Sequence, residues 1–572
     1  MTSKILFVLL LWAACIGQGL AQGGSYADSP FGIMAAFDPT TLTTISASDK
    51  IVWAGEKFRD LGAKWSRGAG EKTFWGTNEP VLGAGYDWST SDDVLKKVYQ
   101  NGGENFNMVV IISSQRVKGG SSDIPSADEQ YFINYVKAFV ERYDGDGTAD
   151  YDTIIKVKYW QMSNEPFPNH WEDAGGTIDG YVRFAELTHN AIKEADPDAK
   201  IILGTFQFQT NEQIDKLNEV ISKSAIKNKK LFDYADTHFW ESGNNYKIPL
   251  VDAKKIFDDN GYSDIGYMTL EFGTTVRRAT EKDQANYLIK GFVSNMAQGF
   301  TLINWNNLVE WNAFGGNPNS IYNYMGLIAD GINGDPIPAG TKRLSYYTYK
   351  KMVEVLEGSD WKNIATIQEQ NGIHIYKFTK PFDGAQCKPV WVAWNDSSVT
   401  RTITISGISS DRVKATEAVP KYESGKDVAD YTTAFQTDTL VVTNGAAALT
   451  LGQRPVFIEP LTVTSVEYEG ENIPKEFILY QNYPNPFNPT TTIQFSLTPS
   501  LSQWERVSEG RVRVTLKVFD VLGREVATLV NGELNTGEHS VVFEAKSLSG
   551  GVYFYRLRAA GFIQTKKMLI SK

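Results

Sequence analysis

Two carboxylates follow apolar stretches of the sequence and are candidates for paired acid and base chemistry. Glu165 ends the run WQMSN and precedes Pro166, which has no N–H to continue a strand ladder. Glu271 ends the run YMTL and precedes Phe272 and Gly273. One protonated and one ionised carboxyl about 5 to 5.5 Å apart can cleave a glycosidic bond with retention of configuration. We therefore take Glu165 and Glu271 as the candidate catalytic pair.

Other interpretations of these acids stay open at this point. Glu165 could be a rim carboxylate that binds a loop, and Glu271 a salt-bridge partner at a strand end. Glu241, Glu310 and Asp236 also lie near predicted strand ends and could supply a nucleophile. None of these three is followed by the Phe-Gly pair that follows Glu271.

The elements that must position these carboxylates form a regular series. From Phe31 to about Gly358, short apolar runs alternate with amphipathic segments of helical period, which is typical of parallel strands joined by helices. Eight such units predict an α/β protein with a (β/α)8 barrel over residues 22–358. An open doubly wound sheet is the alternative, but no glycine-rich phosphate loop follows the first run. The predicted strands begin at Phe31, Ala63, Asn107, Val157, Ala199, Tyr234, Gly266 and Phe300.

In such a barrel the ligand-contacting groups lie where the strands end. Glu165 ends the fourth predicted strand and Glu271 the seventh, and these strands face each other across the barrel. The same rim would therefore hold both carboxylates. The helices expected between the strands include 91–101, 128–143, 180–195, 281–297 and 342–356.

The sequence changes character after the barrel. Beyond Leu356 the apolar period becomes two, which predicts a β-sandwich over residues 359–464. A polar linker over 465–475 then leads to a second all-β module over 476–572.

Asn164-Glu165-Pro166 together with Glu271 resembles the signature of clan A glycoside hydrolases, over the whole barrel and the sandwich. The resemblance implies that Glu165 is the acid/base, Glu271 the nucleophile and Asn164 the donor to the sugar 2-hydroxyl. It also implies that Arg67 lies beside the nucleophile and that His238 orients the site. A carboxylate neighbour would raise the pKa of the acid, while the cation keeps the nucleophile ionised.

Tryptophan rings can stack on the C–H faces of sugars, and several lie near predicted strand ends. Trp305 on the eighth strand matches the tryptophan that clan A enzymes place under the reacting sugar. Trp240, Trp75 and Trp311 are further candidates, although packing at the top of the barrel is the commoner role for this residue.

The resemblance also has departures. Many cellulase-like members carry His-x-Tyr on strand six, where this chain has His238-Phe239-Trp240. They also place a histidine after strand three, where this chain has Ser113-Ser114-Gln115. These departures favour the xylosidase-like relatives and leave the sugar open.

The N-terminus has the pattern of an export signal. Lys4, the apolar run of residues 5–14 and a small-x-small site ending at Ala21 predict a cleaved signal peptide over 1–21. The apolar run is too short to cross a bilayer core of about 30 Å. Cys15 could instead carry a lipid, but the bulky residue at position 12 fits that pattern poorly. Cleavage would leave Cys387 alone, so we expect no intramolecular disulfide.

Charge and composition limit the partners. The net charge of -11 argues against nucleic acid or anionic lipid and favours a neutral partner such as carbohydrate. We expect no cofactor, no metal and no membrane span in the mature protein. The acidic turn Asp144 to Asp152 offers oxygen ligands that calcium would accept, but its spacing is not that of an EF-hand and we favour a solvated turn.

The C-terminal module carries a second resemblance. The run YQNYPNPFNPT over 480–490, with VFDVLGREV over 518–526 and GVYFYRL over 551–557, resembles the type A sorting domain of the type IX secretion system. The stretch 499–510 is longer than the family's usual hairpin turn. The resemblance implies the secretion machinery as a partner and a secreted or cell-surface location in a Gram-negative bacterium. A plain immunoglobulin-like spacer is the alternative.

Two functions follow from these observations as expectations. The first is a retaining glycosidase or glycanase that acts on β-linked, plant-type extracellular carbohydrate. The second is a non-catalytic surface carbohydrate-binding protein on a degenerate barrel. The carboxylate pair together with Asn164 and Arg67 favours the first, because binding alone needs no such pair.

Overall fold

The computed structural model describes most of the two compact units of the chain, Met1–Thr462 and Val463–Lys572. The signal peptide, the linker, Glu241 and Trp311 lie outside the described residues. The described residues are 29–34, 37, 46–68, 70–116, 122–167, 170–240, 243–276, 280–310, 324–331, 337–380, 388–461, 477–497, 511–535, 537–545, 548–559 and 562–571.

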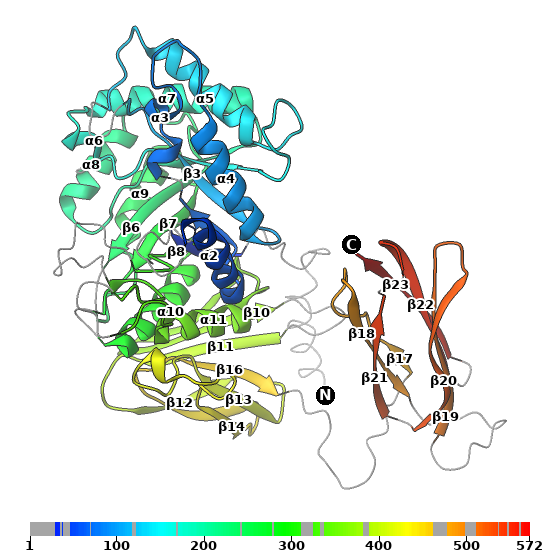
Figure 1. Ribbon diagram of the computed structural model, residues 1–572. Coiled ribbons are helices and arrows are strands. Elements are labelled where there is room, and N and C mark those ends of the chain that lie inside the picture. The colour runs from blue at the N-terminus through cyan, green and yellow to red at the C-terminus, as the bar shows by residue number, and fades with distance from the viewer. Residues whose placement is uncertain are drawn as a thin grey trace, which may run out of the picture. The chain divides into compact units, whose positions relative to one another are not determined.

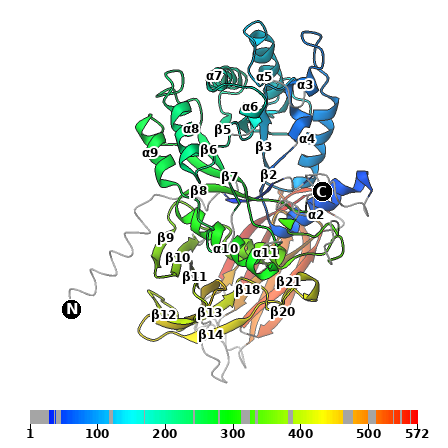
Figure 2. The same ribbon diagram turned by 90° about the vertical axis from the view of Figure 1, so that its left-hand side faces the viewer.

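Eight parallel strands close into a barrel in the order β1 to β8. Figures 1 and 2 show barrel strands such as β6, β7 and β8 with helices around them. Each is short and buried, because apolar side chains face both the barrel interior and the surrounding helices. All eight predicted strands are present, so the predicted barrel is confirmed. The strands are β1 Phe31–Met34, β2 Trp65–Arg67, β3 Asn107–Ile112, β4 Tyr159–Met162, β5 Lys200–Leu203, β6 Tyr234–Trp240, β7 Gly266–Gly273 and β8 Phe300–Trp305.

Helices surround the barrel, and their starts agree with capping chemistry. The Thr177 hydroxyl accepts a hydrogen bond from Gly180 N at the start of α7, and Thr280 forms a capping box with Asp283 at the start of α10. The helices are α2 Ala47–Leu61, α3 Trp75–Asn78, α4 Ser89–Gly102, α5 Glu129–Tyr143, α6 His170–Asp173, α7 Ile178–Ala195, α8 Asn211–Ile221, α9 Val251–Asp259, α10 Glu281–Ala297 and α11 Leu344–Leu356.

A sandwich of antiparallel strands follows α11. Its larger sheet has the order β14-β13-β16-β11-β10-β9, and β12 pairs with β15 in a second sheet. Apolar side chains of both sheets, among them Trp391 and Leu451, form its core. The strands are β9 Ala365–Gln370, β10 Ile373–Lys380, β11 Lys388–Asn395, β12 Arg401–Ser406, β13 Arg412–Glu417, β14 Thr437–Val441, β15 Ala446–Leu451 and β16 Val456–Leu461.

A buried polar cluster joins the sandwich to the barrel. Lys290 of α10 lies 3.0 Å from Asp396 Oδ1, and its side chain is only 4% exposed. The other oxygen, Asp396 Oδ2, accepts from Tyr246 at 2.8 Å and lies 2.8 Å from His374 Nε2. In Figures 1 and 2, α10 and α11 lie between the barrel strands and the sandwich sheet. These contacts tie both parts into one unit.

The C-terminal unit is a separate pair of antiparallel sheets with its own core. The sheets have the orders β17-β18-β21 and β20-β19-β22-β23, and Phe495, Leu516 and Tyr555 are among the fully buried residues between them. Within the residues that the structure describes, no helix of either unit is long and apolar enough to span a bilayer. The strands are β17 Ile478–Leu479, β18 Thr490–Leu497, β19 Arg511–Phe519, β20 Glu525–Asn535, β21 Gly537–Glu544, β22 Gly551–Ala559 and β23 Phe562–Ile570.

Candidate active site

The predicted carboxylates lie together at the carboxyl-terminal rim of the barrel. Glu165 follows β4 and Glu271 lies on β7, and both side chains are 12% exposed. His238 of β6 is the register partner of Glu271, after a register shift that lies between Asp236 and His238. Such irregularities re-aim strand side chains and are common beside active sites.

Arg67, at the end of β2, binds three of the surrounding side chains. Its Nη1 donates to Glu271 Oε1 at 2.6 Å, its Nε donates to Gln161 Oε1 at 2.7 Å, and its Nη2 donates to Asn164 Oδ1. The arginine side chain is only 3% exposed, so solvent screens its attraction to Glu271 weakly. The structure thus places Arg67 beside Glu271, where the sequence led us to expect it.

His238 contacts both carboxylates through one ring nitrogen. Its Nδ1 lies 2.7 Å from Glu165 Oε1 and 3.7 Å from Glu271 Oε1, and the ring is fully buried. The two Oε1 atoms therefore lie no further apart than the sum of these distances, about 6.4 Å.

A buried aspartate lies beneath the histidine. Asp236 accepts from Gln161 Nε2 at 2.8 Å, from Leu270 N at 2.8 Å and from the Thr205 hydroxyl. Its Oδ2 also lies 3.3 Å from His238 Nε2. Asp236 is 1% exposed and separated from the rim by His238, which excludes it as the alternative nucleophile.

Gln161 and Thr205 are site residues that we did not predict. Gln161 connects Arg67 to Asp236, so an unbroken chain of polar contacts runs below the rim from Glu271 to Glu165. The available signal was polarity inside an otherwise apolar strand: Gln161 stands between Trp160 and Met162 and is fully buried.

The protonation of the pair differs from our expectation. Burial would raise the pKa of Glu165, but the hydrogen bond and charge of His238 outweigh it and lower that pKa to about 2. Burial would lower the pKa of His238, but the charges of Glu271 and Asp236 raise it to about 10. The resting protein therefore holds an ion pair, with the proton on His238. The expected rise in the pKa of Glu165 is wrong for this state because a buried cation, and not only a carboxylate, is its neighbour.

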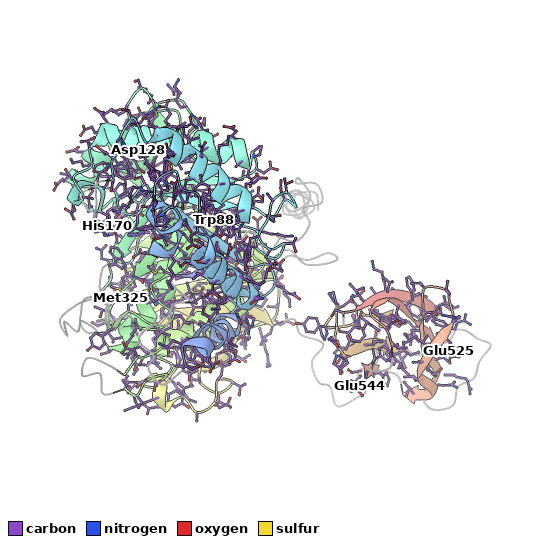
Figure 3. All side chains as sticks on the ribbon, turned by 45° about the horizontal axis from the view of Figure 1, so that its top comes forward. Trp88, Asp128, His170, Met325, Glu525 and Glu544 are labelled. Carbon is purple, nitrogen blue, oxygen red and sulfur yellow. The ribbon has the colours of Figure 1, made fainter. Side chains whose placement is uncertain are left out.

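The backbone that carries Asn164 and Glu165 has an unusual conformation. Ser163 has φ 67° and Glu165 has φ 41°, a left-handed region that costs energy for residues other than glycine and recurs at functional sites. Two backbone hydrogen bonds hold the segment, from Ser163 N to Ile112 O and from His170 N to Glu165 O, both at 2.9 Å. His170, labelled in Figure 3, also places Nδ1 3.2 Å from Asn164 Nδ2. Both polar atoms of the Asn164 amide therefore have a partner, Oδ1 in Arg67 and Nδ2 in His170.

The predicted tryptophans differ in exposure. Trp240 is partly exposed, and its ring centroid lies 5.3 Å from that of His238. Trp305 is fully buried and donates to Met325 O at 3.0 Å. Trp75 is also buried, donates to Glu79 and lies under the Arg116 guanidinium at 4.8 Å. Trp75 and Trp305 are thus buried in the packing, which is the alternative role given for them, and their contact with a sugar stays a prediction.

The remaining acidic candidates have structural partners. Glu310 is buried and accepts from Arg343 Nε at 2.6 Å. In the acidic turn, carboxylate oxygens of Asp144, Asp146 and Asp150 lie within 4.8 Å of one another. Asp150 accepts from two backbone amides of this turn, at 3.0 and 2.7 Å, and Asp144 is buried.

The solved structures with a similar fold include glycoside hydrolases. A variant of the glycoside hydrolase BuGH86 in complex with neoagarooctaose has a TM-score of 0.50 and 11% identity, over 96% of this chain and 96% of that one. The GH51 alpha-L-arabinofuranosidase from Thermotoga petrophila has a TM-score of 0.48 and 12% identity, over 71% of this chain and 89% of that one. At these identities the likeness is one of fold. No curated protein sequence matches the chain.

The C-terminal unit has a family match. Residues 481–571 match the family of secretion system C-terminal sorting domains. The predicted sorting domain is confirmed, and its presence makes this an exported protein that is secreted or held at the cell surface.

Proposed function

We propose that the protein is an exported retaining glycoside hydrolase, with Glu271 as nucleophile and Glu165 as acid/base. The observation that carries this proposal is the position of both carboxylates on one histidine nitrogen, with Arg67 bound to Glu271. The upper bound of about 6.4 Å between their Oε1 atoms is compatible with the spacing of about 5 to 5.5 Å that a covalent glycosyl-enzyme requires. The fold of the structural neighbours and the export domain agree with this function.

In the first step, Glu271 attacks the anomeric carbon as the glycosidic C–O bond breaks. Arg67 donates to Glu271 and holds it in place before attack. The leaving oxygen takes up the one proton that the His238–Glu165 pair holds. The product of this step is an ester between Glu271 and the sugar, with a neutral Glu271 and a neutral His238.

In the second step, a water molecule attacks the same carbon and Glu271 leaves as a carboxylate. Glu165 is ionised at this point and takes the proton of the water, which returns to the pair. Asn164, oriented by Arg67 and His170, presents one amide N–H toward the 2-hydroxyl of the sugar. Trp240 supplies the partly exposed ring of the site, on which a sugar could stack.

The substrate class is a neutral extracellular carbohydrate with β-linkages. A net charge of -11 gives no long-range attraction to polyanions. The BuGH86 structure holds an agar oligosaccharide, so agar oligosaccharides belong with plant-type polysaccharides among the substrates to test.

The test is hydrolysis by the mature full-length protein, its Glu165→Gln variant and its Glu271→Gln variant. Substrates are aryl β-glycosides, plant polysaccharides and agar oligosaccharides, and binding to each is measured in parallel. We expect wild-type cleavage of at least one substrate and a loss of at least about 1,000-fold in the Glu271 variant. Wild-type binding without cleavage of any substrate would favour a carbohydrate-binding protein, and full activity in either variant would contradict the assignment.

A further inference from the structure

We propose that Asp236 and Thr205 are positioning residues that fix the tautomer of His238. They hold a hydrogen on Nε2, so that Nδ1 is the nitrogen that exchanges its proton with Glu165. The catalytic consequence rests on the function proposed above, but the tautomer itself does not. The buried contacts determine each donor and acceptor in turn.

The assignment starts at Arg67, which can only donate. Arg67 Nε donates to Gln161 Oε1, which fixes the orientation of that amide and directs Gln161 Nε2 away from the arginine. Gln161 Nε2 then donates to Asp236 Oδ2 at 2.8 Å and to the Thr205 hydroxyl oxygen at 3.2 Å. The orientation of Gln161 is thus set from the nucleophile side of the site.

The Thr205 hydroxyl connects the oriented Gln161 amide to His238. Its hydroxyl hydrogen is donated to Asp236 Oδ2, so its oxygen can only accept from its other neighbours. His238 Nε2 lies 3.1 Å from that oxygen and 3.3 Å from Asp236 Oδ2. Both groups are acceptors at this nitrogen, and an unprotonated Nε2 would face two lone pairs in a buried site. Nε2 therefore carries a hydrogen in both the neutral and the charged ring.

The titrating nitrogen of His238 is then Nδ1, which faces the two catalytic carboxylates. The proton that it shares with Glu165 is the proton available to the leaving group. Esterification of Glu271 removes the negative charge that lies 3.7 Å from His238 Nδ1. Loss of this charge lowers the proton affinity of the His238–Glu165 pair at the step in which the leaving oxygen takes up the proton. The titratable and charged groups that face the His238–Glu165 pair are Glu271, Asp236, Arg67 and His170.

Asp236 supplies a negative charge beside His238 that is present in both steps of the reaction. It is buried, it stays ionised because the charge of His238 outweighs burial and lowers its pKa, and it is never esterified. Its charge favours the protonated form of His238 even while Glu271 is esterified and neutral. The pair can therefore recover its proton in the second step while Glu271 is still leaving.

The first measurement is the tautomer, read from nitrogen-15 chemical shifts of histidine in the mature full-length protein. The chain has five histidines, and a His238→Gln variant identifies the signal of interest. The neutral form of the His238 ring is populated by raising the pH. This is done in wild type and in a Glu271→Gln variant, which mimics the neutral ester. We expect hydrogen on Nε2 of this ring in both proteins. A neutral ring with hydrogen on Nδ1 would overturn the proposal.

The second measurement is the titration midpoint of His238 in an Asp236→Asn variant. Loss of the buried charge should lower that midpoint by at least about one pH unit, and the alkaline limb of kcat/KM should move with it. Asp233→Asn is the matched control. Asp233 directly precedes β6 and accepts a hydrogen bond from Ile201 N at 2.9 Å, and it is not one of the residues that link Glu271 to Glu165. An unchanged midpoint in Asp236→Asn would overturn the proposal.

The two readouts separate this inference from the proposed function. If Asp236→Asn does not fold, the wild-type tautomer decides the question. If the tautomer and the midpoint shift are found but no glycoside is cleaved, the proposed function fails while the positioning role stands.

Discussion

At the residue scale, the site depends on contacts that only one side-chain type can make. Arg67 binds Glu271, Gln161 and Asn164 with three different nitrogens, which the single ammonium of a lysine cannot reproduce. Glu165 depends in the same way on the position of His238. The chemistry of the pair is therefore a property of the buried network as much as of the two carboxylates.

We expect Arg67→Met to lower kcat/KM by about 100- to 1,000-fold, because Glu271 loses its charge-assisted donor. Arg67→Lys should lose less, since it keeps the charge but not the contacts to Asn164 and Gln161. Steady-state kinetics on an aryl glycoside checks both variants. Equal activity of wild type and Arg67→Met would show that the arginine is not part of the site.

The sequence predicted five of the residues that the structure brings together at this rim: Glu165, Glu271, Asn164, Arg67 and His238. It could not predict the contacts of Gln161 and Thr205, because both lie in apolar runs whose inward direction depends on strand register. It also missed the charge on His238, which arises from Glu271 on β7, Asp236 on β6 and Glu165 after β4. Only the closed barrel brings these groups within reach.

At the element scale, close packing of α10 against β7 helps to fix the position of Glu271. Gly291 of α10 lies against Phe272, the residue after Glu271, and a Cβ at this glycine would lie 2.2 Å from the ring. The helix thus approaches the strand more closely than any other residue type would allow.

We expect Gly291→Ala to destabilise the protein and to impair catalysis. The gain of about 1 kcal/mol in helix propensity is outweighed by about 1 to 3 kcal/mol of overpacking. Displacement of Phe272 should move Glu271 and lower kcat by about 10- to 100-fold. Thermal unfolding and kinetics check this, with Gly452→Ala as control because nothing lies within 4 Å of the added atom. An active and more stable Gly291→Ala variant would contradict this packing argument.

Periodicity predicted the barrel strands well because each is buried on both faces, and a buried strand reads as an apolar run. In the sandwich it did not predict β9, β13 or β16. The sequences of β9 and β13, ATIQEQ and RVKATE, are rich in polar residues, and β9 is an edge strand with mostly exposed or half-exposed side chains. Pairing with neighbours distant in sequence determines these strands.

At the scale of the whole molecule, the cluster around Asp396 makes the barrel and the sandwich one unit. Burial would raise the pKa of Asp396, but His374 and Lys290 outweigh it and lower that pKa below its usual 3.8. A lowered carboxyl pKa stabilises the folded state above the usual value, and the contribution is lost as the pH falls through the folded pKa.

We expect Asp396→Ala to lower the free energy of unfolding by about 3 to 5 kcal/mol at pH 7, because Lys290 is left buried without its partner. The difference from wild type should shrink once the pH falls below the usual value of 3.8, and it should be lost as the pH falls through the lowered pKa of folded Asp396. Denaturant unfolding at pH 7 and pH 3 checks both statements. A difference that grows toward pH 3 would contradict them.

The sorting domain has its own core and should be separable from hydrolysis. A chain that ends at Thr462 should keep kcat/KM within about twofold of wild type, because the site lies wholly in the first unit. The same truncation should leave the protein inside the producing cell envelope, as fractionation would show. Lost hydrolysis in a folded truncated protein would mean that the second unit takes part in the site.

Azide rescue of the mature Glu165→Ala variant on an aryl β-glycoside tests the central claim most directly. Azide is a nucleophile that needs no general base, so it should attack the glycosyl ester of Glu271 and restore turnover. Proton NMR of the product should show a glycosyl azide with the anomeric configuration of the substrate. A glycosyl azide of inverted configuration would contradict the double displacement and the role of Glu271 as nucleophile.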